Sequence, residues 1–129
     1  MLFLLFQLGN DRYALKASDV VEIVPLVALK ELPQAPKGVA GLFNYRGQPI
    51  PAIDLCHLTV GHSASERLST RIIIINYPDQ NGKNHLVGLI AENATETLRK
   101  DPEQFADSGL RLNQAPYHAN FLPSDLLFC

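Results

Sequence analysis

The segment Pro33–Leu55, PQAPKGVAGLFNYRGQPIPAIDL, carries the most structural information in this chain of 129 residues. Two apolar arms, Gly38–Tyr45 and Gln48–Leu55, flank the pair Arg46-Gly47, a pattern typical of a β-hairpin with a tight turn. Gly47 permits the positive φ that such a turn needs and so holds Arg46 at its tip. A permanently charged, fork-shaped donor on a rigid tip indicates recognition of a partner rather than catalysis.

The return arm of this hairpin contains Pro49 and Pro51. Because they occupy alternate positions, their missing N–H groups fall on one side of the strand, and we expect that side to be an edge or a bulge. Glu22 lies in an apolar run upstream of the hairpin. It is either a half-buried partner of Arg46 or a solvent-facing strand residue, and the sequence leaves both interpretations open.

Short apolar, β-branched runs recur between turn signals along the chain, which predicts an all-β barrel or sandwich. Four consecutive isoleucines, Ile72–Ile75, predict a central strand that is buried on both faces. Asp19 and Glu22 are spaced to cap one helical turn, although the β-branched residues between them favour a strand; both remain open. Besides the two hairpin arms, the expected strands are Leu2–Leu8, Arg12–Leu15, Val20–Val24, Val27–Leu29, Arg71–Tyr77, His85–Ile90 and Ala91–Leu98, with loops at His57–Thr70 and Arg99–Pro116.

The composition indicates one globular domain, with 47% hydrophobic residues and a formal net charge of −2. The basic residues are scattered, which excludes the basic face typical of nucleic-acid binding. The apolar start, Met1–Phe6, is too short to span a bilayer and has the character of a first strand. The two cysteines, Cys56 and Cys129, form no CxxC pair and are expected to be reduced, as in a cytoplasmic protein.

Four residues, Asp54, Cys56, His57 and His62, are of types that bind zinc, but their spacing matches no recognised zinc pattern. The chain contains no nucleophile motif and no phosphate-binding glycine loop that opens a helix. We therefore expect no catalytic residue, no bound metal and no cofactor.

Four segments of the chain together resemble the CheW-like family, the adaptor proteins of bacterial chemosensory arrays. The hairpin carries the most specific part of the resemblance, the arrangement APxxVxGxxNxRGxxxPxxDL. The four segments are Phe3–Leu15 (FLLFQLGNDRYAL), Val20–Leu29 (VVEIVPLVAL), Pro33–Leu55 and Leu86–Leu98 (LVGLIAENATETL).

The resemblance implies two small, intertwined, five-stranded SH3-like β-barrels around a shared core, with about residues 9–50 in the second barrel and the remainder in the first. It implies a non-catalytic adaptor that couples the cytoplasmic tips of chemoreceptors to the regulatory domain of a CheA-type histidine kinase. The implied receptor-binding residues are Arg46, Glu22, Val20 and Gly41. The resemblance places the kinase-binding surface on the other barrel, without named residues.

The C-terminal end departs from the family pattern. Members usually continue after the segment matching Ala115-Pro116-Tyr117 into a turn, a last strand and a helix, whereas this sequence ends with His118–Cys129. Either the protein is truncated, so that the first barrel lacks its last strand, or that strand comes from elsewhere. The resulting unpaired edge would favour aggregation, a partner, or strand exchange between two copies of the chain.

Two other functions remain as alternatives. A generic SH3-like peptide-binding module would require an aromatic surface groove, and a cluster of Tyr13, Tyr45 and Tyr77 would support it. A small metal-dependent enzyme would use Asp54, His57 and His62, and stoichiometric zinc in the purified protein would support it.

Overall fold

The computed structural model describes residues 1–35, 38–78, 81–99, 101, 106–107 and 127–128. Within this part of the chain the protein is mostly β-structure with one short α-helix. The elements are β1 (Leu2–Leu8), β2 (Asp11–Lys16), the 3-10 turn η1 (Ala17–Asp19), β3 (Val20–Pro25), β4 (Val39–Tyr45), β5 (Gln48–Asp54), α1 (Leu55–Val60), β6 (Arg71–Pro78), β7 (Asn84–Arg99), β8 (Ala106–Asp107) and β9 (Leu127–Phe128).

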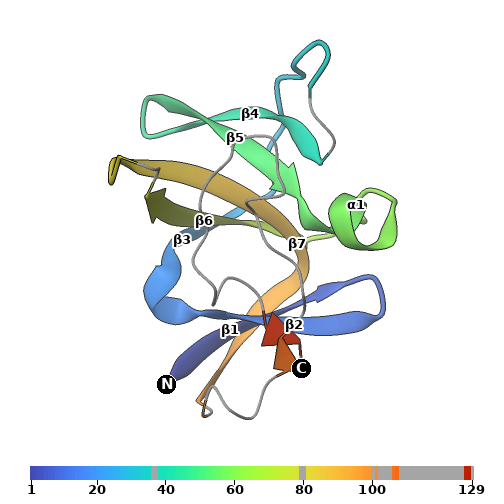
Figure 1. Cartoon of the computed structure of the whole chain (residues 1–129). Helices are drawn as coiled ribbons and strands as arrows, with labels where there is room; N and C mark the ends of the chain where they lie inside the picture. Colours follow the sequence, from blue (N-terminus) through green and yellow to red (C-terminus); the bar gives the residue numbers. More distant parts are fainter. Residues whose placement is uncertain (36–37, 79–80, 100, 102–105, 108–126, 129) are drawn as a thin grey trace.

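The strands form two sheets that share the long strand β7 (Figure 1). The first half of β7 pairs with β6 and, in parallel, with β5, while the second half pairs with β1. We call β3–β6 with the first half of β7 the hairpin sheet. We call β1, β2, β8, β9 and the second half of β7 the terminal sheet. β2 lies in the terminal sheet and β6 in the hairpin sheet.

The hairpin sheet closes on itself through a bridge between Lys30 and Leu42. Each residue donates its N–H to the carbonyl of the other at 2.8 Å, which joins the chain after β3 to β4. The outer side of β5 stays open at both prolines, because β5 pairs with β7 only from Ala52 to Asp54. The expectation of an edge beside Pro49 and Pro51 is therefore confirmed.

Three groups of buried side chains fill the fold. The largest, which we call the shared core, contains residues from both sheets, and a second, the hairpin core, lies inside the hairpin sheet. Ile73 and Ile75 face the shared core, while Ile72 and Ile74 face the hairpin core. The prediction of a central strand buried on both faces is confirmed for these four residues, all of which have 0% exposure. A third, smaller group consists of Phe3, Leu5 and Ala14.

Four sequence-based expectations need correction. The expected loop Arg99–Pro116 begins with the last residue of β7 and contains strand β8. No strand forms at Val27–Leu29, where only the following Lys30 bridges to β4. The expected loop His57–Thr70 begins inside helix α1, because the Asp54 side chain caps it and Gly61, at φ +85°, ends it. His85–Ile90 and Ala91–Leu98 belong to one strand, β7. The question left open at Asp19 is answered by the turn η1 followed by strand β3, and Asp19 does not cap a helix.

The end of the chain contributes a short strand to the terminal sheet. Leu127 and Phe128 of β9 pair with Ala14 and Tyr13 of β2, so the edge of β2 is covered at these two positions. Residues 108–126 and Cys129, which include Ala115–Tyr117 and most of His118–Cys129, lie outside the described residues. Among those that are described, no helix is long and apolar enough to cross a membrane.

Candidate functional site: a hairpin arginine held by Glu22 and Tyr45

The β4–β5 turn places Arg46 at the tip of the hairpin. Arg46 has φ +50° and Gly47 has φ +83°, and positive φ at both central residues is the type I′ pattern that suits a two-residue hairpin. The N–H of Gly47 donates to Oδ1 of Asn44, the residue just before the turn, at 2.8 Å, which ties the turn to β4. A left-handed backbone conformation costs an arginine about 1 kcal/mol relative to glycine. The contacts of the Arg46 side chain offset this backbone strain.

The carboxylate of Glu22 is the partner of Arg46. Glu22 Oε1 accepts a hydrogen bond from an Arg46 terminal nitrogen at 2.9 Å and another from the Tyr45 hydroxyl at 2.6 Å. The Arg46 side chain is 75% exposed and that of Glu22 is 39% exposed. Of the two interpretations of Glu22, the structure therefore supports the half-buried partner. An ion pair this exposed contributes about 0–1 kcal/mol to stability, so it orients the arginine more than it stabilises the fold.

Tyr45 contacts both charged residues. Its ring centroid lies 5.3 Å from Cζ of Arg46, within the range of a cation–π interaction. The hydrogen bond to Glu22 raises the pKa of the Tyr45 hydroxyl, with a smaller contribution from burial. The hydroxyl therefore stays protonated, and stays a donor to Glu22, throughout the neutral range. The sequence analysis considered Tyr45 only for an aromatic peptide-binding groove and assigned it no role beside Arg46.

Val20 and Gly41 lie beneath this surface. Val20 is half-buried and packs against the shared core, on the other side of a β-bulge from Glu22. Gly41 is buried, and its φ of +155° brings its backbone against the carbonyl of Lys30. The structure thus brings Glu22 and Arg46 together, while Val20 and Gly41 support the strands that carry them.

The four residues considered for zinc serve other purposes. Asp54 is 7% exposed, and its two oxygens accept the backbone N–H groups of His57 at 3.2 Å and Ala64 at 3.0 Å. Cys56 is fully buried, and His62 lies at the surface with Nδ1 3.0 Å from the carbonyl of Ser63. Within the described ranges, no three or more His, Cys, Asp or Glu side chains are grouped to hold a metal ion.

Glu92 links the β1–β2 turn to helix α1 and to the loop that follows the helix, a role that the sequence analysis missed. It lies where β7 passes from pairing with β6, at Ala91, to pairing with β1. Its Oε1 accepts from Gly9 N at 3.2 Å and from the Cys56 thiol at 3.5 Å, and Oε2 accepts from Ser65 N at 2.9 Å. Its partners lie up to 83 positions away in the sequence, so only the polar residue after a buried run could have drawn attention to it.

Cys56 is shielded from thiol chemistry. Burial, together with the nearby negative charges of Glu92 and Asp54, raises the pKa of the Cys56 thiol to about 12. Because the thiolate is the reactive form, the buried thiol is inert and acts as a small apolar residue with a weak donor.

A model of the CheW-like domain matches residues 2–123, which is nearly the whole chain. The chain belongs to the CheW-like family. It is 31% identical over 98 residues to a chemotaxis protein CheW of Helicobacter pylori, covering 75% of this chain and 56% of the relative. It is 28% identical over 102 residues to a chemotaxis protein CheW of Klebsiella aerogenes, covering 79% of this chain and 58% of the relative. The chain therefore spans little more than half the length of these curated relatives.

The fold also matches a solved CheW. The crystal structure of the scaffolding protein TtCheW from Thermoanaerobacter tengcongensis superposes with a TM-score of 0.69 at 28% sequence identity, covering 82% of this chain and 66% of that one. The expected fold class, an all-β CheW-like fold, is thereby confirmed.

The tyrosines of this CheW-like chain bear on the peptide-binding alternative. Tyr13 packs against the shared core and stacks on Phe6 at 6.2 Å between ring centroids, whereas Tyr45 packs against the hairpin core. The side chain of Tyr77 lies outside the described residues. Tyr13 and Tyr45 do not form a common aromatic surface.

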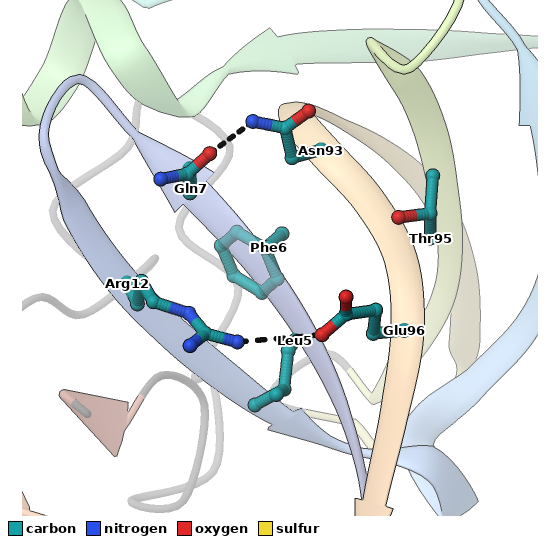
Figure 2. A pocket seen from close by; sticks show the side chains of 7 residues that line it. All are labelled: Leu5, Phe6, Gln7, Arg12, Asn93, Thr95 and Glu96. Carbon is teal, nitrogen blue, oxygen red and sulfur yellow. Dashed lines mark hydrogen bonds and ion pairs between the residues drawn. The ribbon is translucent and has the colours of Figure 1, made fainter.

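A hollow of about 330 Å³ on the terminal sheet is a second surface feature of this CheW-like domain (Figure 2). Four of its five polar side chains are directed at one another: Asn93 donates to Gln7, and Arg12 pairs with Glu96 at 3.5 Å. These internal pairs occupy the groups that a ligand would need. The lining residues are Leu5, Phe6, Gln7, Arg12, Asn93, Thr95 and Glu96.

The pKa of the Glu92 carboxyl predicts how the free energy of unfolding depends on pH. Burial alone would raise its pKa, but the hydrogen bonds from Ser65, Gly9 and Cys56 outweigh burial and lower the pKa of this carboxyl. A lowered folded-state pKa gives stability that is present above the unfolded pKa, about 4.3, and is lost as the pH falls through the folded value. We expect Glu92→Gln to reduce the free energy of unfolding by about 1–2 kcal/mol at pH 7 and by progressively less below pH ~4.3.

Urea denaturation of wild type and Glu92→Gln, from pH 7 to below pH ~4.3, measures the difference in the free energy of unfolding. Glu96→Gln is a matched control, because Glu96 lies on the same strand with its side chain 68% exposed and in an ion pair with Arg12. We expect the control to change stability by no more than about 0.5 kcal/mol. Parallel pH profiles for wild type and Glu92→Gln would contradict the role assigned to Glu92.

Proposed function

We propose that this chain is a non-catalytic scaffold that couples the cytoplasmic tips of chemoreceptors, the methyl-accepting chemotaxis proteins, to a CheA-type histidine kinase. Family membership over residues 2–123 supports this proposal, as do relatives named as chemotaxis and scaffolding proteins. The roles found for two acidic residues agree with it, because Asp54 caps helix α1 and Glu92 joins the β1–β2 turn to the loop after that helix.

The observation that carries the proposal is the presentation of Arg46. Glu22 accepts a hydrogen bond from one terminal nitrogen of Arg46, and the guanidinium lies over the ring of Tyr45. The Arg46 side chain is nevertheless 75% exposed. A guanidinium has five N–H donors in a planar fork that matches the two oxygens of a carboxylate. Arg46 and Glu22 would face a carboxylate-bearing receptor helix, with Val20 and Gly41 supporting their strands, while the kinase docks on another face.

Arg46→Ala should weaken binding to a receptor-tip fragment by about tenfold, the loss of one charge-assisted contact. Arg46→Glu should weaken it by at least a further tenfold, because it places like charges beside Glu22 and beside the receptor carboxylate. Isothermal titration against the receptor fragment, with thermal unfolding to verify the fold, measures both.

Arg12→Ala is the matched control, because Arg12 is also an exposed arginine paired with one glutamate, on the terminal sheet. It should bind the fragment as wild type does. Equal affinities for wild type, Arg46→Ala and Arg12→Ala would refute the assignment of Arg46, and no binding by wild type would refute the receptor partner.

The remaining parts of the proposal concern place and assembly. The scaffold would work in the cytoplasm, joined to membrane receptor arrays through its partners and without direct membrane or nucleic-acid contact. Two copies would also be able to exchange strands, because among the described residues β9 pairs with β2 at two positions, Tyr13 and Ala14. Light scattering across a concentration series tests this, with a constant monomer mass counting against it.

A further inference from the structure

We propose that Tyr45 is a positioning residue for the receptor-facing surface, which sets the direction of the Arg46 guanidinium and keeps Glu22 satisfied when Arg46 engages a carboxylate. This inference rests on the proposed function and assigns a part of that site. Tyr45 makes three contacts at once: its body packs against the hairpin core, its hydroxyl donates to Glu22 at 2.6 Å, and its ring lies under Arg46.

The contact between Tyr45 and Arg46 requires an unusual backbone. Successive side chains of a strand point to opposite faces, so neighbours do not normally stack. Here the positive φ of Arg46, +50°, turns the chain at this residue, and the guanidinium carbon lies 5.3 Å from the adjacent ring centroid. The ring is anchored in the hairpin core, so it gives the exposed guanidinium a fixed surface to rest on.

The contact between Tyr45 and Glu22 gives that surface its second function. Glu22 Oε1 accepts hydrogen bonds from both Tyr45 and Arg46. The Tyr45 hydroxyl therefore holds the carboxylate in the position where Arg46 binds it. A half-buried carboxylate left without a donor is costly. Since Tyr45 remains bonded to Glu22, Arg46 can turn towards a receptor carboxylate without leaving Glu22 unpaired.

A double-mutant cycle tests this coupling through binding. Tyr45→Phe keeps the ring and removes the hydroxyl, and Tyr45→Leu removes both. We expect affinity for the receptor-tip fragment to fall about threefold in Tyr45→Phe and about tenfold in Tyr45→Leu, in keeping with one hydrogen bond and one added cation–π contact. In the Arg46→Ala background, both substitutions should change affinity by less than about 1.5-fold, because a positioning residue has nothing left to position.

The same losses in both backgrounds would mean that Tyr45 contributes only packing or a contact of its own, which would overturn the inference. Thermal unfolding of each variant verifies that the binding losses do not follow from partial unfolding.

A second measurement needs no partner. NMR of the arginine side chains reports rotation of the Arg46 guanidinium about its Nε–Cζ bond, with Arg12 as an internal reference. We expect the rotation rate of Arg46 to rise several-fold in Tyr45→Leu and less in Tyr45→Phe, while that of Arg12 stays constant. An unchanged Arg46 rate would overturn the positioning role. If wild type fails to bind the receptor fragment, the proposed function fails, while this measurement still decides whether Tyr45 orients Arg46.

Discussion

Gly41→Ala is expected to lower the free energy of unfolding by about 3 kcal/mol, because both the backbone conformation and the space at this site require glycine. A Cβ at residue 41 would lie 2.6 Å from the carbonyl oxygen of Lys30 and 3.1 Å from Cβ of Leu29. That same carbonyl accepts the N–H of Leu42 at 2.8 Å. The new methyl group must therefore push apart the bridge that closes the hairpin sheet.

Gly82→Ala separates the cost of the positive φ from the cost of the steric clash. Gly82 also has a positive φ, +79°, but a Cβ there would have no atom within 4 Å. It should therefore cost only the conformational term, about 1 kcal/mol. Chemical denaturation of both variants measures the difference, and a Gly41→Ala effect no larger than that of Gly82→Ala would rule out the clash with Lys30.

This result bears on how Gly41 contributes to the receptor-facing surface. The family resemblance groups Gly41 with Arg46 and Glu22, yet Gly41 is buried against Lys30. We expect a glycine here to act on binding through closure of the sheet that carries Arg46. Loss of affinity in Gly41→Ala should therefore accompany loss of the Lys30–Leu42 hydrogen bonds, seen as faster amide exchange at Leu42.

The parts of the fold that the sequence predicted are those determined by local chemistry. The turn around Arg46 and Gly47 follows from a glycine that tolerates positive φ, and the burial of Ile72–Ile75 follows from an unbroken β-branched run. The hairpin edge at Pro49 and Pro51 follows from two missing donors. Each of these features needs no information about distant segments.

The parts that escaped prediction depend on contacts between distant segments. β7 continues through Ala91 because two different strands, β6 and β1, pair with it in succession. Glu92 gains its importance from Gly9 and Ser65, which lie far away in the sequence. Helix α1 was missed although Asp54 and Gly61 are ordinary capping residues, because its single short turn carries no hydrophobic period.

The same division holds at the candidate site. Arg46 and Glu22 were identified from the sequence, but their pairing was left open, since 24 positions separate them. Tyr45 was considered from the sequence only as a member of a possible aromatic cluster with Tyr13 and Tyr77. Its role depends on the direction of its hydroxyl and ring, which a hairpin pattern alone does not give.

Gly88→Ala should also destabilise the protein by about 3 kcal/mol, for a reason that concerns packing alone. Gly88 lies in β7 opposite Ile74 and beside Ala52, without a positive φ. A Cβ there would lie 2.6 Å from Cγ2 of Ile72 and 2.7 Å from Cε1 of Phe43. Both are rigidly placed side chains of the hairpin core, so they cannot move aside as a flexible chain end would. In an open strand position the same substitution would be neutral or favourable.

Phe43→Leu provides the test of that mechanism. By itself it should cost about 1 kcal/mol, because it removes part of a buried ring. In the Gly88→Ala background it removes the ring atoms that the new methyl group meets, so the double variant should be more stable than the sum of the two losses by about 1 kcal/mol. Urea denaturation of wild type, Gly88→Ala, Phe43→Leu and the double variant measures all four free energies of unfolding in this double-mutant cycle. Strict additivity would mean that the Phe43 ring is not what excludes a side chain at residue 88, leaving Ile72 or the backbone of β7 as the cause.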